Sequence, residues 1–141
     1  MATHVLLADD YPPIRDWVKS VLQSNGFEVD AEASSGKEAV SLALRFRPDV
    51  IVMDRQMPCL NGLEAAREIL RTMPGTHVVM FTNHADESDL AEGLRIGIRG
   101  FAVKTAGAKE LLQAIREVLM GKTYVDPGFS HLGADGEVPA N

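Results

Sequence analysis

The sequence has one cysteine, Cys59, and no long run of apolar residues. A single cysteine cannot form a disulfide within the chain, and a membrane span or signal-peptide core needs a longer apolar stretch. Basic residues are also scarce, since 14 Lys and Arg stand against 20 Asp and Glu, a formal net charge of -6. We therefore expect a cytoplasmic protein without a membrane span. Its own surface should bind proteins or small ions rather than DNA or an anionic membrane.

The sequence also lacks a glycine-rich turn after its first apolar run, where it reads ADDYPPI. A dinucleotide-binding domain needs such a turn, because the backbone must approach the pyrophosphate closely. That class is therefore excluded. Apolar material is plentiful, because 45% of the 141 residues are hydrophobic, and this is enough for one core. We expect one folded domain.

Short apolar runs alternate along the chain with segments whose apolar residues recur at helical spacing. The run from Val50 to Met53 has four apolar residues and no polar alternation, which indicates a strand buried on both faces. Proline and glycine separate the segments. The expected strands are residues 5–8, 27–33, 50–53, 77–81 and 100–103. The expected helices end at Asn25-Gly26, Pro48, Pro74-Gly75, Gly97 and Gly121.

Five strands that alternate with five helices imply a mostly parallel sheet with helices on both faces. In such sheets, ligands bind outside the carboxyl ends of the strands. Asp9 and Asp10 follow the first strand, and Asp54 follows the third. Thr82 follows the fourth strand and Lys104 the fifth. We therefore expect three carboxylates, a hydroxyl and an ammonium group at one edge of the sheet.

Each of these side chains also has an ordinary structural explanation. The aspartates could cap a helix or begin a loop, Thr82 could be a turn hydroxyl, and Lys104 could be a solvated surface charge. Together, however, three neighbouring carboxylates would repel one another unless a cation lay among them. Oxygen ligands without a His or Cys cluster favour Mg²⁺ or a similar hard ion. The sequence therefore predicts an acidic cation site.

Four stretches at these strand ends carry a family resemblance: ADD, MDRQMP followed by CLNG, FTN and GFAVKT. They resemble the receiver domain of response regulators in bacterial two-component systems, and the resemblance runs from about His4 to Gly121. It implies a flavodoxin-like (CheY-like) α/β fold. That fold is a doubly wound five-stranded parallel sheet with strand order 2-1-3-4-5 and helices on both faces. We expect residues 1–121 to form the receiver domain and residues 122–141 to form a linker or disordered tail.

The resemblance also assigns a metal site. Asp54 would be the phosphoacceptor for a sensor histidine kinase. Asp10 and Asp54 would bind Mg²⁺ directly, together with the backbone carbonyl of Gln56, and Asp9 would reach the ion through water. A Mg²⁺-dependent phosphatase would use similar groups, but such enzymes usually carry two aspartates spaced by one residue, and Asp9 and Asp10 are adjacent. We therefore expect a signalling switch that catalyses only its own phosphorylation and dephosphorylation.

The resemblance further assigns residues that respond to the phosphoryl group. Lys104 would contact it, and Thr82 would donate its hydroxyl to it, which vacates space for Phe101. Phe101 could equally be an ordinary core ring. Gln56, Asn83 and His84 flank the route of donor or water and could tune the rates, although His84 could also be an exposed loop residue. Thr105 follows Lys104 where many receivers have a proline whose peptide bond is cis. A cis bond before a residue other than proline is costly, so we do not assume one there, and the sequence leaves the isomer open.

The stretch KTAGAKELLQAIREVLMGKTYVDP resembles NarL/LuxR-type regulators, in which a linker leads to a DNA-binding domain. Residues 122–141 are too few and insufficiently basic for such a domain. We expect transcriptional output through a DNA-binding domain absent from this chain. The alternative is a stand-alone receiver, or a scaffold that is never phosphorylated and acts by protein contacts. A homodimer would use the expected helix near 86–96, the strand 100–103 and the last helix.

Overall fold

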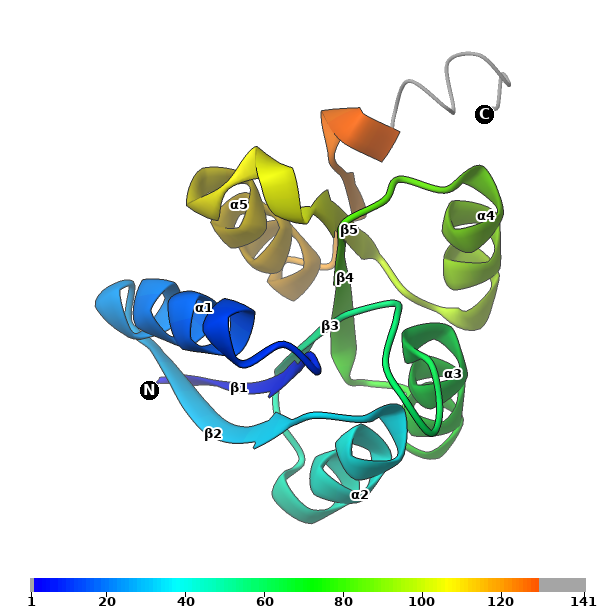
Figure 1. Ribbon diagram of the computed structural model, residues 1–141, viewed down its shortest axis with the longest axis horizontal. Coiled ribbons are helices and arrows are strands. Elements are labelled where there is room, and N and C mark those ends of the chain that lie inside the picture. The colour runs from blue at the N-terminus through cyan, green and yellow to red at the C-terminus, as the bar shows by residue number, and fades with distance from the viewer. Residues whose placement is uncertain (1, 130–141) are drawn as a thin grey trace.

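A parallel sheet of six strands lies at the centre of the protein, in the order β2-β1-β3-β4-β5-β6 (Figure 1). The computed structural model describes residues 2–129. The strands are β1 (Thr3–Ala8), β2 (Phe27–Ala33), β3 (Val50–Met53), β4 (His77–Thr82), β5 (Gly100–Val103) and β6 (Tyr124–Val125). The helices are α1 (Pro12–Ser24), α2 (Gly36–Phe46), α3 (Gly62–Thr72), α4 (Glu87–Ile96), the short 3-10 helix η1 (Lys104–Ala106) and α5 (Ala108–Leu119).

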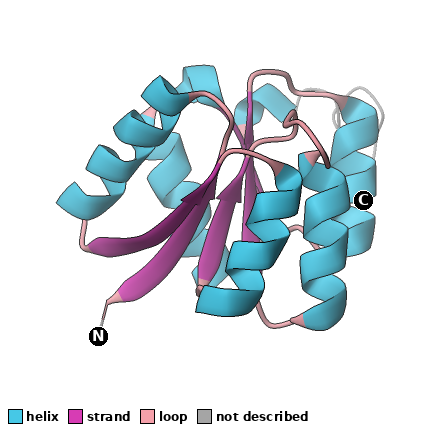
Figure 2. Ribbon diagram, turned by 60° about the horizontal axis from the view of Figure 1, so that its bottom comes forward, coloured by secondary structure: helices cyan, strands magenta, loops and turns pink. Residues whose placement is uncertain are grey.

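Helices cover both faces of the sheet, as Figure 2 shows. Helices α1 and α5 pack on one face, and α2, α3 and α4 pack on the other. Alternate residues of β1 point to opposite faces, so that Val5 joins the core under α1 and α5 and Leu6 joins the core under α2 and α3. All four residues of β3 are buried. The predicted fold class and strand order are therefore confirmed.

The helix boundaries follow the local signals in the sequence. Helix α2 begins after Ser35, whose side chain accepts a hydrogen bond from the backbone N–H of Glu38. Helix α3 begins with a capping box between Asn61 and Glu64. Helix α4 ends at Gly97, whose φ of 111° belongs to the left-handed region that glycine tolerates best. Local sequence therefore sets the lengths of these helices.

The sheet has one strand more than the sequence predicted. Residues 122–141 were expected to form a linker or disordered tail, but within that range Tyr124 and Val125 form β6 beside β5. The side chain of Phe129 is fully buried. A strand of two residues carries no alternation, and the neighbouring glycine and proline made the segment look like a linker. The rest of the predicted linker, residues 130–141, lies outside the described residues.

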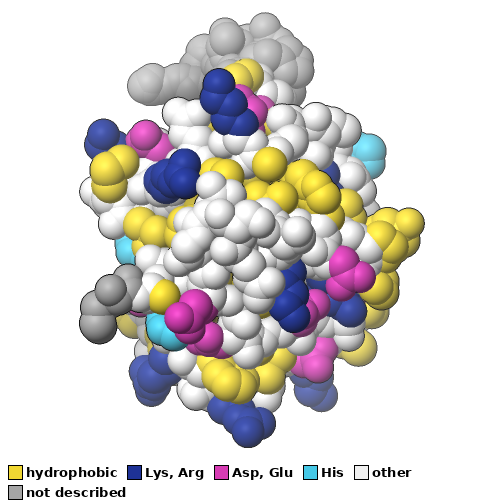
Figure 3. Space-filling model, turned by 90° about the vertical axis from the view of Figure 1, so that its left-hand side faces the viewer, with side chains coloured by type: hydrophobic (Ala, Val, Ile, Leu, Met, Phe, Trp, Pro, Cys, Tyr) yellow, Lys and Arg dark blue, Asp and Glu magenta, His cyan; other side chains and the backbone are white. Residues whose placement is uncertain are grey.

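Surface charges of both signs are interspersed on the face of the molecule shown in Figure 3. Lys and Arg side chains do not gather into one basic patch on that face. Within residues 2–129, no helix combines the length and the hydrophobicity that a membrane crossing requires.

Candidate functional site

The predicted site residues meet at the carboxyl edge of the sheet. Lys104, after β5, places its Nζ atom 2.5 Å from Asp9 Oδ2, after β1, and 3.2 Å from Asp54 Oδ2, after β3. The side chain of Lys104 is only 7% exposed. The lysine thus joins two strand ends that are 95 and 50 residues distant from it in sequence. Removal of one partner from a nearly buried pair leaves an uncompensated charge, so it is more destabilising than the loss of a surface ion pair.

Three carboxylates gather at the same place. Asp9, Asp10 and Asp54 each offer one oxygen atom, and these atoms lie within 4.8 Å of one another. They line a cleft of about 270 Å³ together with Gln56 and Lys104. Lys104 offsets only part of the negative charge, and every carboxylate donor is a hard oxygen ligand. The donor set therefore fits Mg²⁺, as the sequence predicted.

Burial is the strongest influence on the Asp54 carboxyl group, and it raises the pKa above its ordinary value. The positive charge of Lys104 acts in the opposite direction and lowers the pKa, while the negative charge of Asp9 raises it. Asp54 therefore ionises less readily than an exposed aspartate. Positive charge nearby, from Lys104 or from a bound cation, favours the ionised form that a nucleophile requires.

The loop after β3 is packed tightly around the backbone of Asp54. A Cβ atom added to Gly62 would lie 2.0 Å from the main-chain oxygen of Asp54, so only glycine fits there. The backbone N–H of Gly62 donates to the carbonyl of Arg55 at 2.8 Å. The Arg55 side chain in turn donates to Asp89 of α4 at 3.0 Å. The loop that carries Asp54 is therefore linked directly to α4.

Sequence reasoning missed Arg15, which holds the other side of the site. Its Nη1 atom donates to the main-chain carbonyl of Asp9 at 2.6 Å, and its Nε atom donates to Glu32 at 3.2 Å. The backbone N–H of Tyr11 donates to Asp9 Oδ1 at 2.9 Å. An arginine on the polar face of α1 looks like any solvated charge in the sequence, so no pattern could have revealed this contact.

The two predicted switch residues are both buried. Thr82 is 5% exposed, and its hydroxyl forms no hydrogen bond to another described residue. The Phe101 ring is fully buried and meets the ring of Phe129 edge-on, with centroids 5.7 Å apart. The structure therefore holds Phe101 inside the core, in a contact that the sequence did not predict.

The remaining predicted residues divide into two groups. Asn83 lines the same cleft as Gln56. His84 is exposed and does not line that cleft. The Lys104-Thr105 peptide bond, whose isomer the sequence left open, is trans.

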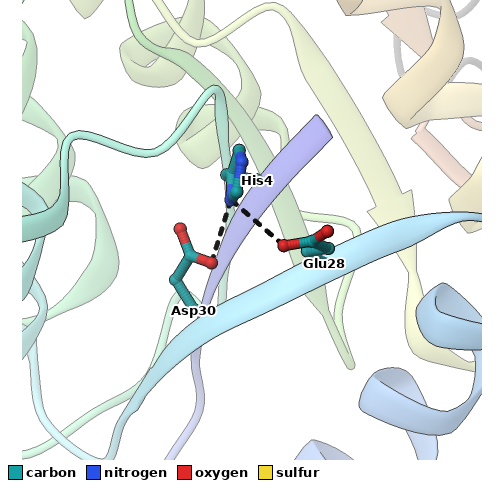
Figure 4. Close-up of side chains that lie close together, drawn as sticks. All are labelled: His4, Glu28 and Asp30. Carbon is teal, nitrogen blue, oxygen red and sulfur yellow. Dashed lines mark hydrogen bonds and ion pairs between the residues drawn. The ribbon is translucent and has the colours of Figure 1, made fainter. Parts of the chain in front are cut away.

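A second ionisable cluster, separate from the Asp9, Asp10 and Asp54 group, is formed by His4 of β1 with Glu28 and Asp30 of β2 (Figure 4). His4 Nδ1 lies 3.0 Å from Asp30 Oδ1 and 3.8 Å from Glu28 Oε1. The hydrogen bond with Asp30 is the main cause that raises the pKa of His4. This cluster links β1 to β2 at the surface and takes no part in the carboxylate site.

Comparison with known proteins identifies the family of this chain. Residues 5–116 match the response regulator receiver domain. The chain belongs to the response regulator receiver family. Receiver domains are signalling switches, and the resemblance predicted from the sequence is confirmed.

Three similar proteins illustrate the relationship. The chain is 35% identical to the transcriptional regulatory protein DegU of Brevibacillus brevis over 90% of its own length and 54% of DegU. It is 36% identical to the response regulator GacA of Pseudomonas aeruginosa over 87% of its length and 58% of GacA. A crystal structure of a LuxR-family two-component response regulator from Aurantimonas sp. superposes with a TM-score of 0.93 at 28% identity, over 99% of this chain and 100% of that one. The chain thus spans little more than half the length of DegU and of GacA.

Proposed function

We propose that Asp54 accepts a phosphoryl group from a phosphohistidine of a sensor histidine kinase. The observation that carries this proposal is the position of Asp54, which is 7% exposed at the end of β3 and lies 3.2 Å from Lys104 Nζ among two further carboxylates. An oxygen of Asp54 would attack the phosphorus, and the bond between phosphorus and the imidazole nitrogen would break. The electron pair of that bond would leave on the imidazole, and Asp54 would become an aspartyl phosphate.

Asp9, Asp10 and Asp54 would hold Mg²⁺ together with the backbone carbonyl of Gln56. When bound, Mg²⁺ would offset the negative charge that the nucleophile and the phosphodonor bring together. Lys104 would leave its ion pair with Asp9 and contact the phosphoryl oxygens, because a flexible ammonium can follow a moving charge. The chain would catalyse only its own phosphorylation and dephosphorylation.

The phosphoryl group would act on the fold through Thr82. Its hydroxyl has no partner among the described residues and could donate to a phosphoryl oxygen. Such a bond would draw the loop after β4 toward Asp54 and change the packing around Phe101. Phosphorylation adds roughly two negative charges, and it shifts the population only toward the packing that contacts those charges better. Gln56 and Asn83 lie in the cleft and would tune the rates of attack, and the exposed His84 has less support for that role.

The output would be control of transcription through a DNA-binding domain. DegU is named as a transcriptional regulatory protein, which supports this proposal. A homodimer through α4, β5 and α5 would be one way to transmit the signal. The alternative is a stand-alone receiver, or a scaffold that is never phosphorylated. A phosphoryl group on the protein would favour a phosphorylated receiver over the scaffold.

The test is the mass of the intact protein after incubation with Mg²⁺ and acetyl phosphate or phosphoramidate. The wild type should gain one phosphoryl group, and Asp54→Asn or removal of the metal should abolish the gain. Asp49→Asn, directly before the first residue of β3, is the matched control and should be phosphorylated normally. An unmodified wild type would refute the proposal.

A further inference from the structure

We name the segment from Tyr124 to Phe129 the C-terminal strap. It begins as β6 along the outer edge of β5 and ends in a helical turn at residues 127–129 (Figure 1). The backbone N–H of Tyr124 donates to the carbonyl of Arg99 at 2.8 Å. The backbone N–H of Asp126 donates to the carbonyl of Phe101 at 2.8 Å. The strap therefore occupies backbone groups that an edge strand would otherwise offer to another chain.

Side chains fix the strap as firmly as its backbone does. Asp126 is 2% exposed, and its carboxylate accepts from the backbone N–H groups of Gly128 at 2.8 Å and Val103 at 3.4 Å. Phe129 is fully buried. Burying a ring of that size removes a large apolar area from water, and the burial of an acid is tolerated because its oxygens are hydrogen-bonded. The strap is thus a packed part of the receiver.

The strap shares its main contact with the predicted switch. The ring of Phe101 lies between Phe129 and α4, because a Cβ atom added to Gly93 would be 2.7 Å from that ring. The ring therefore cannot move toward α4 without a shift of that helix. Val103, which donates to the strap, is followed directly by Lys104 of the site. The end of β5 therefore contacts the strap through Val103 and carries the site residue Lys104 directly after it.

We propose that the C-terminal strap covers the β5 edge in the unphosphorylated protein and is released when Asp54 is phosphorylated. The inference rests on the function proposed above. Thr82 and Phe101 lie on the neighbouring strands β4 and β5. Movement of Thr82 toward the phosphoryl group, as proposed above, would change the packing around Phe101, and a shift of that ring would remove its contact with Phe129. Release exposes the edge of β5, which the homodimer through α4, β5 and α5 requires.

Docking of the strap and binding of a phosphoryl group at Asp54 would oppose each other by one coupling free energy. Each therefore weakens the other by the same factor. If phosphorylation releases the strap, a weaker strap must favour the phosphorylated packing. Couplings of this kind change an affinity by about 5- to 150-fold. The inference can therefore be tested from the site and from the strap.

The first test is hydrogen exchange of the wild-type protein, with and without Mg²⁺ and beryllofluoride, which mimics the phosphoryl group. Fluorine NMR establishes whether the analogue is bound at Asp54, since Asp54→Asn should abolish the bound signal. With the analogue bound, the amides of Tyr124 and Asp126 should exchange at least about fivefold faster. Unchanged or slower exchange with the analogue bound would overturn the strap proposal alone. Absence of a bound signal in the wild type would overturn the proposed function and the strap proposal with it.

The second test weakens the strap and measures the affinity for beryllofluoride in the presence of Mg²⁺. Phe129→Ala should bind the analogue about fivefold more tightly or better. Phe129→Leu keeps more apolar volume, serves if the alanine variant folds poorly, and should shift the affinity in the same direction. Phe46→Ala is the matched control, because Phe46 is 41% exposed on α2 and lies outside the strap. An affinity of the Phe129 variants equal to or weaker than that of the control would overturn the proposal.

Discussion

Replacement of Lys104 by methionine should destabilise the folded protein when Mg²⁺ is absent. The side chain of Lys104 is 7% exposed, and its ammonium group contacts Asp9 at 2.5 Å and Asp54 at 3.2 Å. Methionine retains most of the apolar volume but leaves these carboxylates without their cation. Removal of one partner from a buried ion pair costs about 3–5 kcal/mol. This is a large part of the roughly 5–15 kcal/mol by which a domain of this kind is stable.

Both Mg²⁺ and pH should change how much stability Lys104→Met loses. Mg²⁺ should restore much of the loss, because a dication replaces the missing positive charge. The loss should also depend on pH. Lys104 lowers the pKa of Asp54, so its removal raises a pKa that burial already elevates. A group whose pKa is higher in the folded state supplies stability below its unfolded pKa and loses it as the pH rises through the folded pKa. The difference between variant and wild type should therefore be small below about pH 4 and grow as the pH rises.

Urea unfolding at several pH values, with and without Mg²⁺, measures these quantities. Lys109→Met is the matched control, because Lys109 is exposed and forms no ion pair among the described residues. It should change the free energy of unfolding by less than about 0.5 kcal/mol. If Lys104→Met is no less stable than Lys109→Met, or if Mg²⁺ has no effect on its stability, the reasoning about the site is wrong.

Gly62→Ala should lower the free energy of unfolding by about 1–3 kcal/mol or more in the same urea experiment, because its Cβ would lie 2.0 Å from the main-chain oxygen of Asp54. Gly75→Ala is the control. A Cβ there would have nothing within 4 Å, so this variant should be neutral or slightly stabilised. His4 has a raised pKa, so its ion pairs should stabilise the protein below about pH 6.5 and lose that effect as the pH rises through the folded pKa. His4→Gln should therefore reduce the melting temperature at pH 5.5 more than at pH 8.5, and an equal reduction at both would contradict this assignment. Thr82→Val should still accept a phosphoryl group by intact mass but should abolish the faster exchange of the C-terminal strap; retained release would exclude Thr82 from the switch.

The sequence was sufficient to predict the five main strands and the place where their polar ends meet. Apolar runs such as Val50 to Met53 and capping signals such as Ser35 with Glu38 act locally, so they are visible in the sequence. In a parallel sheet, the carboxyl ends of all strands lie at the same edge, whatever the distance between the strands in the sequence. For this reason Asp9, Asp54 and the other strand-end residues could be named before any contact was known.

The features that could not be predicted depend on contacts between distant segments. Lys104 bridges two carboxylates only because its side chain reaches across neighbouring strands. Arg15 binds the Asp9 carbonyl from a position that the helical pattern marks as solvent-facing. Only two residues of the C-terminal strap form a strand. Phe129 packs against the ring of Phe101, which lies 28 residues earlier in the sequence. Periodicity and local propensity do not record such partners.

Mapping of the modified residue tests most directly whether Asp54 is the phosphoacceptor, as we propose. After incubation with Mg²⁺ and acetyl phosphate, reduction with borohydride converts an aspartyl phosphate to homoserine, which tandem mass spectrometry can locate. Homoserine should appear at position 54 and at no other aspartate, and none should form when the metal is chelated. Homoserine at Asp9 or Asp10 instead, or its absence from the whole chain, would contradict the account.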